Sequence, residues 1–337
     1  DNVADQGSFF YFRSTAYSSG NRNFNIENCI IENNLGRYGT IHMRETNAEN
    51  TNLNIYNTLF KNNTAKDRGS VKGQGGSVAF LLSNSVPSRL AINVNLTNCT
   101  IVNNQDLGTN TAVNNFTRSP LMLLKVATLD TKVSNTIFWN NTTIGGSNSR
   151  VISSGDQASY GTLAIANSIA NLDFANQSSA EKTNTSNNDP LFTSATDFTL
   201  QTSSPAIDFG DNSKLPAILN IDLAGNNRIF NSTVDLGVYE FGATTFKPTL
   251  TINATDGSVT TNPNPTNGSY NFGENVTLTA VPNAGFEFVD FSGDITSTNI
   301  SESIILDSNK TITANFRPIQ YALNITSDNG TVTTNPN

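Results

Sequence analysis

Polar and apolar residues alternate along much of the first 240 residues, and the alternation changes phase at a recurring asparagine. The seven-residue phrases NCIIENN, NTLFKNN, NCTIVNN and NTIFWNN begin at Asn28, Asn57, Asn98 and Asn135, and a shorter copy, NSIAN, begins at Asn167. Apolar residues lie two and four positions before most of these asparagines, and the best-matched apolar position after them has the opposite parity. Because strand side chains alternate between two faces, each copy predicts two short strands that meet at a tight corner.

Repeated corners of one residue type predict that the copies stack as coils of an all-β solenoid with parallel strands. We expect the five corner asparagines to form an internal ladder in which each amide bonds to the next, about 4.8 Å away. A second strand recurs in each coil, and the matched inward position in it holds Phe9, Ile41, Val78, Leu121 and Val151, followed by Tyr11, Met43, Phe80 and Leu123. The outward positions are then Phe10, His42, Ala79, Met122 and Ile152, followed by Phe12, Arg44, Leu81 and Leu124.

Charge is sparse, which narrows the classes of partner. Only 14% of the 337 residues are charged and the net charge is −8, with no basic segment. Nucleic acid and anionic membranes are therefore not expected partners, and no apolar run predicts insertion into a membrane. The two cysteines, Cys29 and Cys99, each follow a corner asparagine two coils apart. That spacing is too long for a disulfide, so we expect two free, buried thiols.

After residue 172 the periodicity fades into a polar stretch, 176–188, that is typical of a loop. The phrases DPLF, SPAIDFGD, DLAGNNR and VDLGVYEF follow between residues 189 and 241. Together with the asparagine coils, they resemble the "choice-of-anchor Q" family of secreted bacterial proteins in the pectate-lyase-like superfamily. The resemblance implies a right-handed parallel β-helix over residues 1–242, closed by the motif at 189–241.

A second module is expected after a linker near residues 244–248. The phrases TLTINATDGSVTTNP, YNFGENVTLTAVPNAGFEFVDFSGD and KTITANF resemble the divergent InlB B-repeat, a β-rich repeat of bacterial surface proteins, over residues 246–316. Phe291 stands where the family usually has tryptophan, and we expect it to remain a core aromatic. Residues 322–337 repeat the pattern of 249–264, so 320–337 are interpreted as the start of a second copy. Both ends of the sequence are expected to be cut from a longer chain, with further coils upstream.

The outward face of the second strand holds the candidates for catalysis. The side chains of His42, Arg44, Arg13 and Lys125 could form a cationic patch that holds an acidic sugar and removes a proton beside its carboxylate. No cluster of Asp or Glu accompanies them in the pattern. The alternative is a set of solvated side chains beside a surface covered by loops.

The closing motif carries a dense group of charged residues. Its carboxylates could bind Ca²⁺, since that ion prefers oxygen ligands. An arginine among them favours the alternative, a structural set of ion pairs and turn-forming carboxylates. The group consists of Asp208, Asp211, Asp222, Arg228, Asp235 and Glu240.

Trp139, the only tryptophan, has outward parity and could stack on a sugar ring. With Arg44 it is the candidate for ligand binding, although single exposed aromatics are also common without a binding role. The sequence thus favours a secreted or surface-attached bacterial stalk that binds extracellular polysaccharide, with no cofactor. The rival hypothesis is a polysaccharide lyase or glycoside hydrolase of the pectate-lyase-like superfamily.

Overall fold

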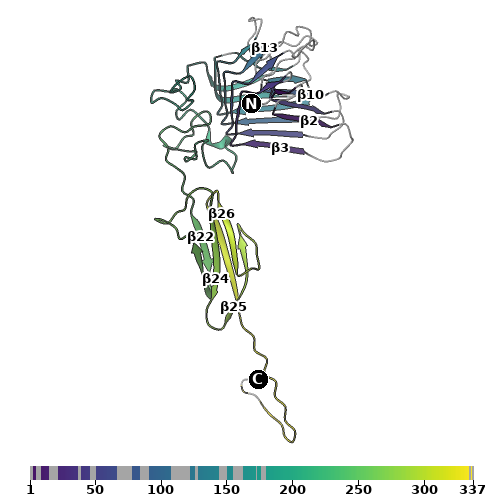
Figure 1. The fold of residues 1–337 in the computed structure, drawn as a ribbon, viewed down its shortest axis with the longest axis vertical. Helices are drawn as coiled ribbons and strands as arrows, with labels where there is room; N and C mark the ends of the chain where they lie inside the picture. Colours follow the sequence, from purple (N-terminus) through teal and green to yellow (C-terminus); the bar gives the residue numbers. More distant parts are fainter. Residues whose placement is uncertain are drawn as a thin grey trace. The chain divides into compact units, whose positions relative to one another are not determined.

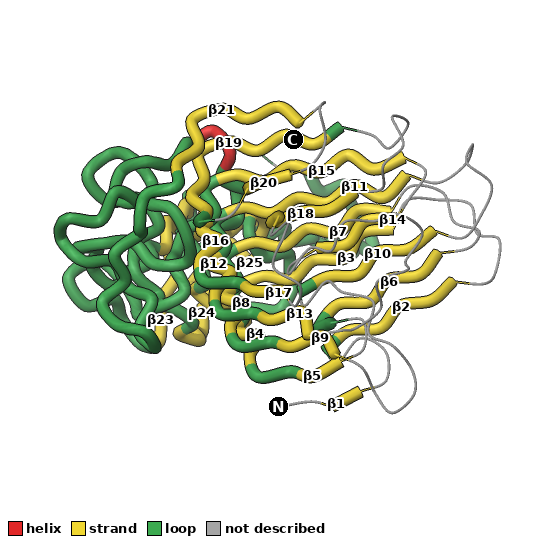
Figure 2. The backbone as a smooth tube through the Cα atoms, turned by 90° about the horizontal axis from the view of Figure 1, so that it is seen from above, coloured by secondary structure: helices red, strands yellow, loops and turns green. Residues whose placement is uncertain are grey.

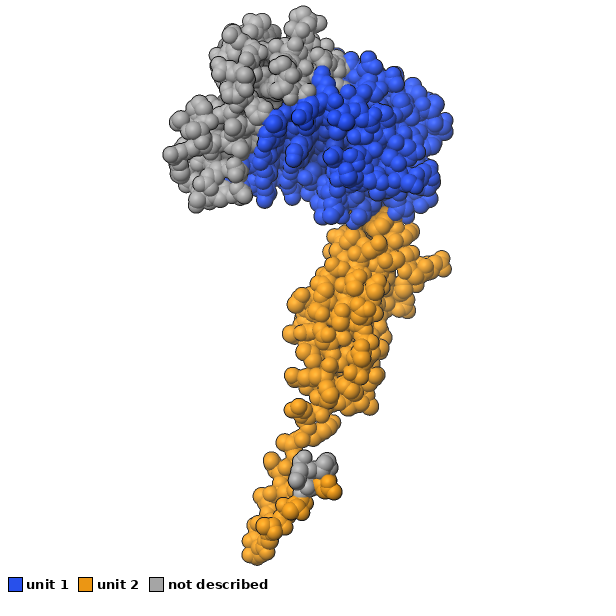
Figure 3. Space-filling view, turned by 180° about the vertical axis from the view of Figure 1, so that it is seen from behind, with its two compact units in different colours: residues 1–245 blue, residues 246–337 orange. Residues whose placement is uncertain are grey.

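The chain forms two compact units, residues 1–245 and 246–337, in a computed structural model (Figure 1; the units are coloured separately in Figure 3). The structure describes residues 3–4, 9–14, 22–36, 39–45, 51–66, 78–83, 91–107, 122–125, 128–143, 150–154, 162–171, 173–175, 180–333 and 335. Each unit is described by itself below. In the described part of the chain, no helix is long and apolar enough to cross a membrane.

Unit 1 is a parallel β-helix, as the sequence predicts, and its strands stack coil upon coil (Figure 2). One sheet contains the predicted second strands. It is built from β2 (Phe10–Ser14), β6 (Ile41–Glu45), β10 (Ala79–Ser83), β14 (Met122–Lys125), β18 (Arg150–Ser154) and β20 (Asp173–Ala175). A small sheet forms another wall and consists of β1 (Val3–Ala4), β5 (Leu35–Gly36), β9 (Thr64–Lys66), β13 (Gln105–Leu107) and β17 (Thr142–Thr143).

The largest sheet contains the asparagine corners and has two arms. The strands before the corners are β3 (Arg22–Glu27), β7 (Thr51–Tyr56), β11 (Ala91–Thr97), β15 (Thr128–Ser134) and β19 (Leu163–Ala170). The strands after the corners are β4 (Ile30–Glu32), β8 (Leu59–Lys61), β12 (Thr100–Val102) and β16 (Ile137–Trp139), and β19 continues into this arm. Inward apolar side chains from the strands form one core, which includes Leu53, Ile55, Val94, Leu96 and Ile101.

The loop predicted at 176–188 is partly wrong, because β21 (Ala180–Ser186) adds a further parallel strand beside β19. Its side chains are largely polar, and those of residues 181–184 are exposed, so no hydrophobic pattern marks it in the sequence. The backbone of β19, which would otherwise be an open sheet edge, supplies the hydrogen-bonding groups that this strand needs.

The predicted register of the second strands also needs correction. Ile41 pairs with Phe10 and Ala79, one residue away from the predicted partners Phe9 and Val78. Phe9 is consequently 47% exposed, while Phe10 packs against the core and Ile152, also predicted to face outward, is buried. Consecutive apolar residues give no clean alternation at these points, so the sequence leaves the parity open. Leu121 lies outside the described residues, whereas Ile41, Met43, Val78 and Val151 are buried as predicted.

The corner asparagines have a conformational role that explains their recurrence. Asn28, Asn57, Asn98, Asn135 and Asn167 all have φ between 44° and 53°. Asparagine is the non-glycine residue that best tolerates this left-handed region, because its short amide can bond locally. The corner therefore selects asparagine through its backbone, whether or not the side chains form a ladder.

A continuous internal ladder does exist, formed by the last asparagine of each phrase. Asn34, Asn63, Asn104 and Asn141 are buried, and each Nδ2 donates to the Oδ1 of the next at 2.9, 2.9 and 3.0 Å. Each Oδ1 on the receiving side also accepts a backbone N–H, as between Asn63 N and Asn104 Oδ1 at 3.0 Å. The ladder thus satisfies buried backbone groups at the second corner of every coil.

Unit 2 is a small sandwich of two three-stranded sheets. One sheet has the order β22 (Leu250–Ala254), β27 (Lys310–Pro318) and β25 (Phe286–Gly293), and the other has β23 (Gly257–Asn262), β24 (Glu274–Pro282) and β26 (Ser301–Leu306). Phe291 is fully buried between them, which confirms its predicted place in the core. No strand follows Pro318 among the described residues, and 320–333 are exposed.

Candidate functional site

The closing segment, residues 187–245, lies along the corner of the large sheet beside β4, β8, β12 and β16 (Figure 2). Apart from a 3₁₀ turn, η1 (Asn212–Lys214), it consists of turns and isolated bridges. Its carbonyl groups accept bonds from the corner amides: Asn98 Nδ2 donates to Asp235 O at 3.0 Å and Asn167 Nδ2 donates to Phe209 O at 3.0 Å. The corner asparagines thus attach this segment to the stack.

This attachment corrects the predicted ladder of corner asparagines. Asn57 donates to Asn28 at 2.7 Å and Asn135 donates to Asn98 at 3.1 Å, but the row is interrupted between Asn57 and Asn98 and again between Asn135 and Asn167. At the first interruption, Arg228 Nη1 donates to Asn57 Oδ1 at 3.2 Å. The row is also not internal, since its amides face the closing segment.

Arg228 is the centre of a buried group that we call the carboxylate clasp, consisting of Asp222, Arg228, Asp235 and Glu240. Its Nη2 donates to Glu240 Oε2 at 2.9 Å, and both side chains are 1% exposed. Both oxygens of each carboxylate accept N–H donors: Asp235, for example, accepts the backbone N–H groups of Asp208 and Phe241 at 2.7 and 2.6 Å. The oxygens that a Ca²⁺ ion would need are therefore already occupied, which favours the structural role.

Burial dominates the electrostatics of the clasp. Desolvation raises the pKa of Glu240 from 4.5 to about 7, against the opposing effect of Arg228, and Asp235 contributes like-charge repulsion. Burial also raises the pKa of Asp235. Burial and repulsion from Asp235 outweigh the attraction of Arg228, so Glu240 favours retention of a proton. At the edge of the segment, the Ser213 hydroxyl and N–H lower the pKa of Asp211.

The burial of His42 argues against the predicted catalytic face. This side chain is 2% exposed, so it is neither accessible to a substrate nor solvated, although its neighbours Ile41 and Met43 face the core and leave His42 with the predicted outward parity. A buried imidazole is not placed to take a proton from a polymer outside the helix. Register aligns Arg13 with Arg44 on adjacent strands, and Lys125 lies in the same row beyond Leu82, but these three side chains lie outside the described part of the structure.

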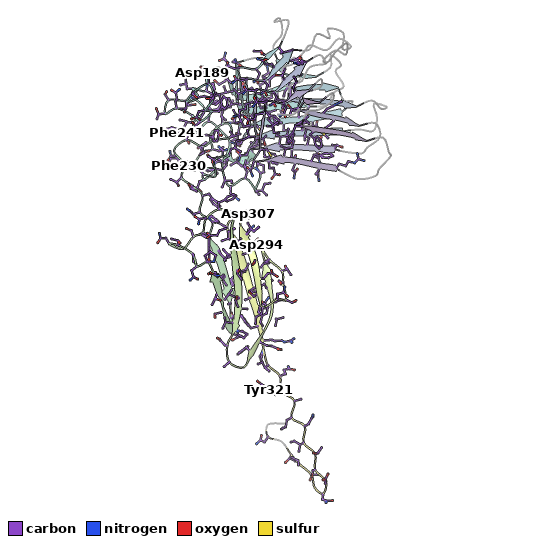
Figure 4. All side chains as sticks on the ribbon, viewed as in Figure 1. Asp189, Phe230, Phe241, Asp294, Asp307 and Tyr321 are labelled. Atoms are coloured by element: carbon purple, nitrogen blue, oxygen red, sulfur yellow. The ribbon has the colours of Figure 1, made fainter. Side chains whose placement is uncertain are left out.

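Trp139 lines a cleft in unit 1. The cleft has a volume of about 260 Å³ and lies between the β12–β16 arm and the start of the closing segment. Trp139 is half-buried and packs with Phe192, so its outward parity is correct but the closing segment covers part of it. Figure 4 labels Asp189, which lines the same cleft. The full lining is Val102, Asn103, Trp139, Asn140, Asp189, Leu191, Phe192, Ser194, Ala195, Phe198 and Gln201.

Two polar side chains of the cleft, Asp189 and Gln201, form hydrogen bonds to the backbone. Asp189 Oδ1 accepts the Leu191 N–H at 2.8 Å, and Gln201 Nε2 donates to Phe192 O at 2.7 Å. Asn103 and Asn140 occupy left-handed corners with φ of 56° and 52°. The cleft therefore offers three aromatic side chains, three side-chain amides and one carboxylate. Sequence reasoning found only Trp139, because the other residues come from segments whose proximity no local pattern reveals.

Comparison with known proteins identifies one part of the chain. Residues 248–320, within unit 2, match the family described as the divergent InlB B-repeat domain. No curated protein and no solved structure matched the chain. Domains of this family typically occur in bacterial surface proteins. The chain thus combines an asparagine-rich parallel β-helix with a divergent InlB B-repeat domain, a module typical of bacterial surface proteins.

Proposed function

We propose that unit 1 is a binding module for extracellular polysaccharide on the surface of a bacterium, and that the Trp139 cleft receives the glycan. The observation that carries this proposal is the grouping of a half-buried indole with three side-chain amides and one carboxylate in a single cleft. A sugar ring presents C–H groups on its faces and hydroxyls around its rim. An aromatic face suits the first, and amide and carboxylate groups suit the second.

The size and charge of the cleft narrow the ligand. Small-molecule sites start at roughly 300 Å³, so a cleft of about 260 Å³ suits one sugar unit of a longer chain. Asp189 is the one charged residue in its lining. A negative group would repel uronic acids, so the cleft favours an uncharged sugar over the acidic sugars that the Arg44 patch would hold.

Glycan-array binding of the whole chain tests the proposal. We expect binding to at least one bacterial or plant polysaccharide, and Trp139→Ala should weaken it about fivefold, because stacking on an aromatic ring is worth on the order of 1 kcal/mol. The matched control is Phe272→Ala, which removes an aromatic that is 41% exposed in unit 2. Equal binding by the wild type and Trp139→Ala, or no binding to any glycan, would contradict the proposal.

A further inference from the structure

A second surface of unit 1 has the regularity of a binding face. On β3, β7 and β11, asparagine occupies two alternate positions in matched register: Asn23, Asn52 and Asn93 in one column, and Asn25, Asn54 and Asn95 in the other. The residues between them, such as Leu53 and Val94, face the core. The six amides therefore lie on the outer face of the sheet, which we call the amide face, and each is exposed or half-buried.

Hydrogen bonds fix the orientation of these amides. Asn52 and Asn93 donate to the preceding asparagine at 2.7 and 2.8 Å, and Asn54 and Asn95 do so at 2.9 and 2.7 Å. A side-chain amide has two N–H donors and an oxygen with two lone pairs, and a ladder uses one of each. The face thus presents a further donor and acceptor on each amide, spaced about 4.8 Å along the stack and about 6.6 Å along each strand.

Folding alone does not account for asparagine at these positions. Asparagine is depleted in strands relative to threonine or valine, and a half-exposed amide can bond to water. The buried ladder of Asn34, Asn63, Asn104 and Asn141 is different, because it bonds backbone groups that water does not reach. The amide face also has rotamers that are fixed before any ligand arrives, which lowers the entropy cost of binding.

Carboxylates beside the amide face indicate that its ligand is uncharged. Glu27 lies beyond Asn25 on β3, and Asp130 continues the first column beyond Asn93. The Thr162 hydroxyl and N–H lower the pKa of Asp130, so this carboxylate stays ionised. Two cations also lie beside the face in the described part of the chain: Lys132 beyond Asn95, and half-buried Arg22 next to Asn23 on β3. Carboxylates at both ends would repel an anionic polymer, whereas an uncharged hydroxylated chain would not be repelled.

We propose that the amide face binds an uncharged linear polysaccharide that runs along the stack across β3, β7 and β11, with its hydroxyls paired to the side-chain amides. The strand spacing is close to the advance of one sugar unit in an extended β-linked chain, so successive coils can contact successive sugars. The inference rests on the proposed function in its class of ligand but uses a separate surface. An extended polar face of this kind lacks the aromatic core that protein interfaces favour.

Affinity electrophoresis of the whole chain through gels containing soluble polysaccharides tests this proposal. The uncharged probes are glucomannan, xyloglucan and hydroxyethyl cellulose, and the acidic probes are alginate and polygalacturonate. We expect retardation by at least one uncharged probe and none by the acidic probes. Asn52→Thr/Asn54→Thr should weaken the retardation about tenfold, since it removes the central amide of both columns while keeping strand propensity.

The control is Asn253→Thr/Asn275→Thr, which changes two exposed strand asparagines of unit 2 and should leave retardation unchanged. Thermal melting of each variant checks that the fold is retained. No retardation by any uncharged probe, or equal retardation of the wild type and Asn52→Thr/Asn54→Thr, would overturn the inference. A concentration-dependent dimer of the wild type that this variant abolishes would also overturn it. Loss of retardation in Trp139→Ala but not in Asn52→Thr/Asn54→Thr would uphold the cleft and refute the amide face. Loss of retardation in Asn52→Thr/Asn54→Thr but not in Trp139→Ala would refute the cleft.

Discussion

Replacing Asn104 by alanine should destabilise unit 1 more than any other single asparagine change in its coil. The side chain is fully buried and takes part in five hydrogen bonds. Its Oδ1 accepts from Asn63 N and Asn63 Nδ2 at 3.0 and 2.9 Å, and its Nδ2 donates to Phe60 O, Val102 O and Asn141 Oδ1 at 3.0, 3.1 and 3.0 Å. Alanine would remove all five and leave buried donors and acceptors behind.

The magnitude follows from those contacts. A hydrogen bond contributes about 0.5–1.5 kcal/mol net, and each buried group left without a partner costs about 1–3 kcal/mol. Some neighbouring groups will recover partners by relaxation, so we expect a loss on the order of 3–5 kcal/mol. The matched control is Asn95→Ala, because Asn95 lies in the same coil but is half-exposed and donates to Asn54 at 2.7 Å. It should cost less than about 1 kcal/mol.

Urea denaturation followed by tryptophan fluorescence is the appropriate assay. Trp139 is the only tryptophan in the chain and belongs to the coil that stacks on Asn104, so its emission reports unit 1 without a contribution from unit 2. The midpoint should fall far more for Asn104→Ala than for Asn95→Ala. Equal midpoints for the two variants, or a shift of Asn104→Ala within error of the wild type, would refute the assignment of the internal ladder.

Three further predictions concern the clasp and the thiols. Arg228→Met should destabilise unit 1 by on the order of 3–5 kcal/mol in the same assay, because it leaves Glu240 buried without its cation. The control is Arg317→Met, at the ion pair with Glu287, whose side chains are 67% and 45% exposed. It should change the stability of unit 2 by less than about 1 kcal/mol. The pKa of Glu240 is raised from 4.5 to about 7, so its contribution to stability is full below pH 4.5 and is lost as the pH rises through about 7. Unit 1 should therefore be less stable at pH 8 than at pH 5, by on the order of 1–3 kcal/mol. Glu240→Gln should flatten this dependence of stability on pH. Burial raises the pKa of Cys99 to about 12. In the native protein a thiol reagent should therefore label half-buried Cys29 first, and Cys99 only on unfolding. Equal labelling rates for the two thiols would contradict the buried position of Cys99.

The repeat made the fold of unit 1 predictable, but not the reason for its asparagines. The change of phase at Asn28, Asn57, Asn98 and Asn135 correctly indicates two strands and a corner, because strand alternation is a local property. The left-handed φ at these positions is a backbone requirement that competes with a ladder as the explanation, and the sequence alone does not separate the two. The internal ladder had an equally regular signal, the second asparagine of each NN pair.

The candidate sites depended on contacts between distant parts of the chain. Arg228 and Asn57 are 171 positions apart, and Trp139 meets Phe192 only because the closing segment runs along the outside of the helix. Local pattern gives the parity of Trp139 but not what covers it. Consecutive apolar residues at Phe9 and Phe10 likewise left the register of β2 undetermined, and the burial of His42 is a consequence of the fold that no periodicity records.

Fluorescence titration of Trp139 with oligosaccharides from the bound polysaccharide tests the central claim most directly. The single indole lines the proposed cleft, so an occupying sugar should change its emission in a saturable manner, and the resulting Kd should match the affinity measured by retention. Phe272→Ala should give the same curve. An emission that stays constant while the chain still binds the glycan would contradict the assignment of the cleft as the polysaccharide site.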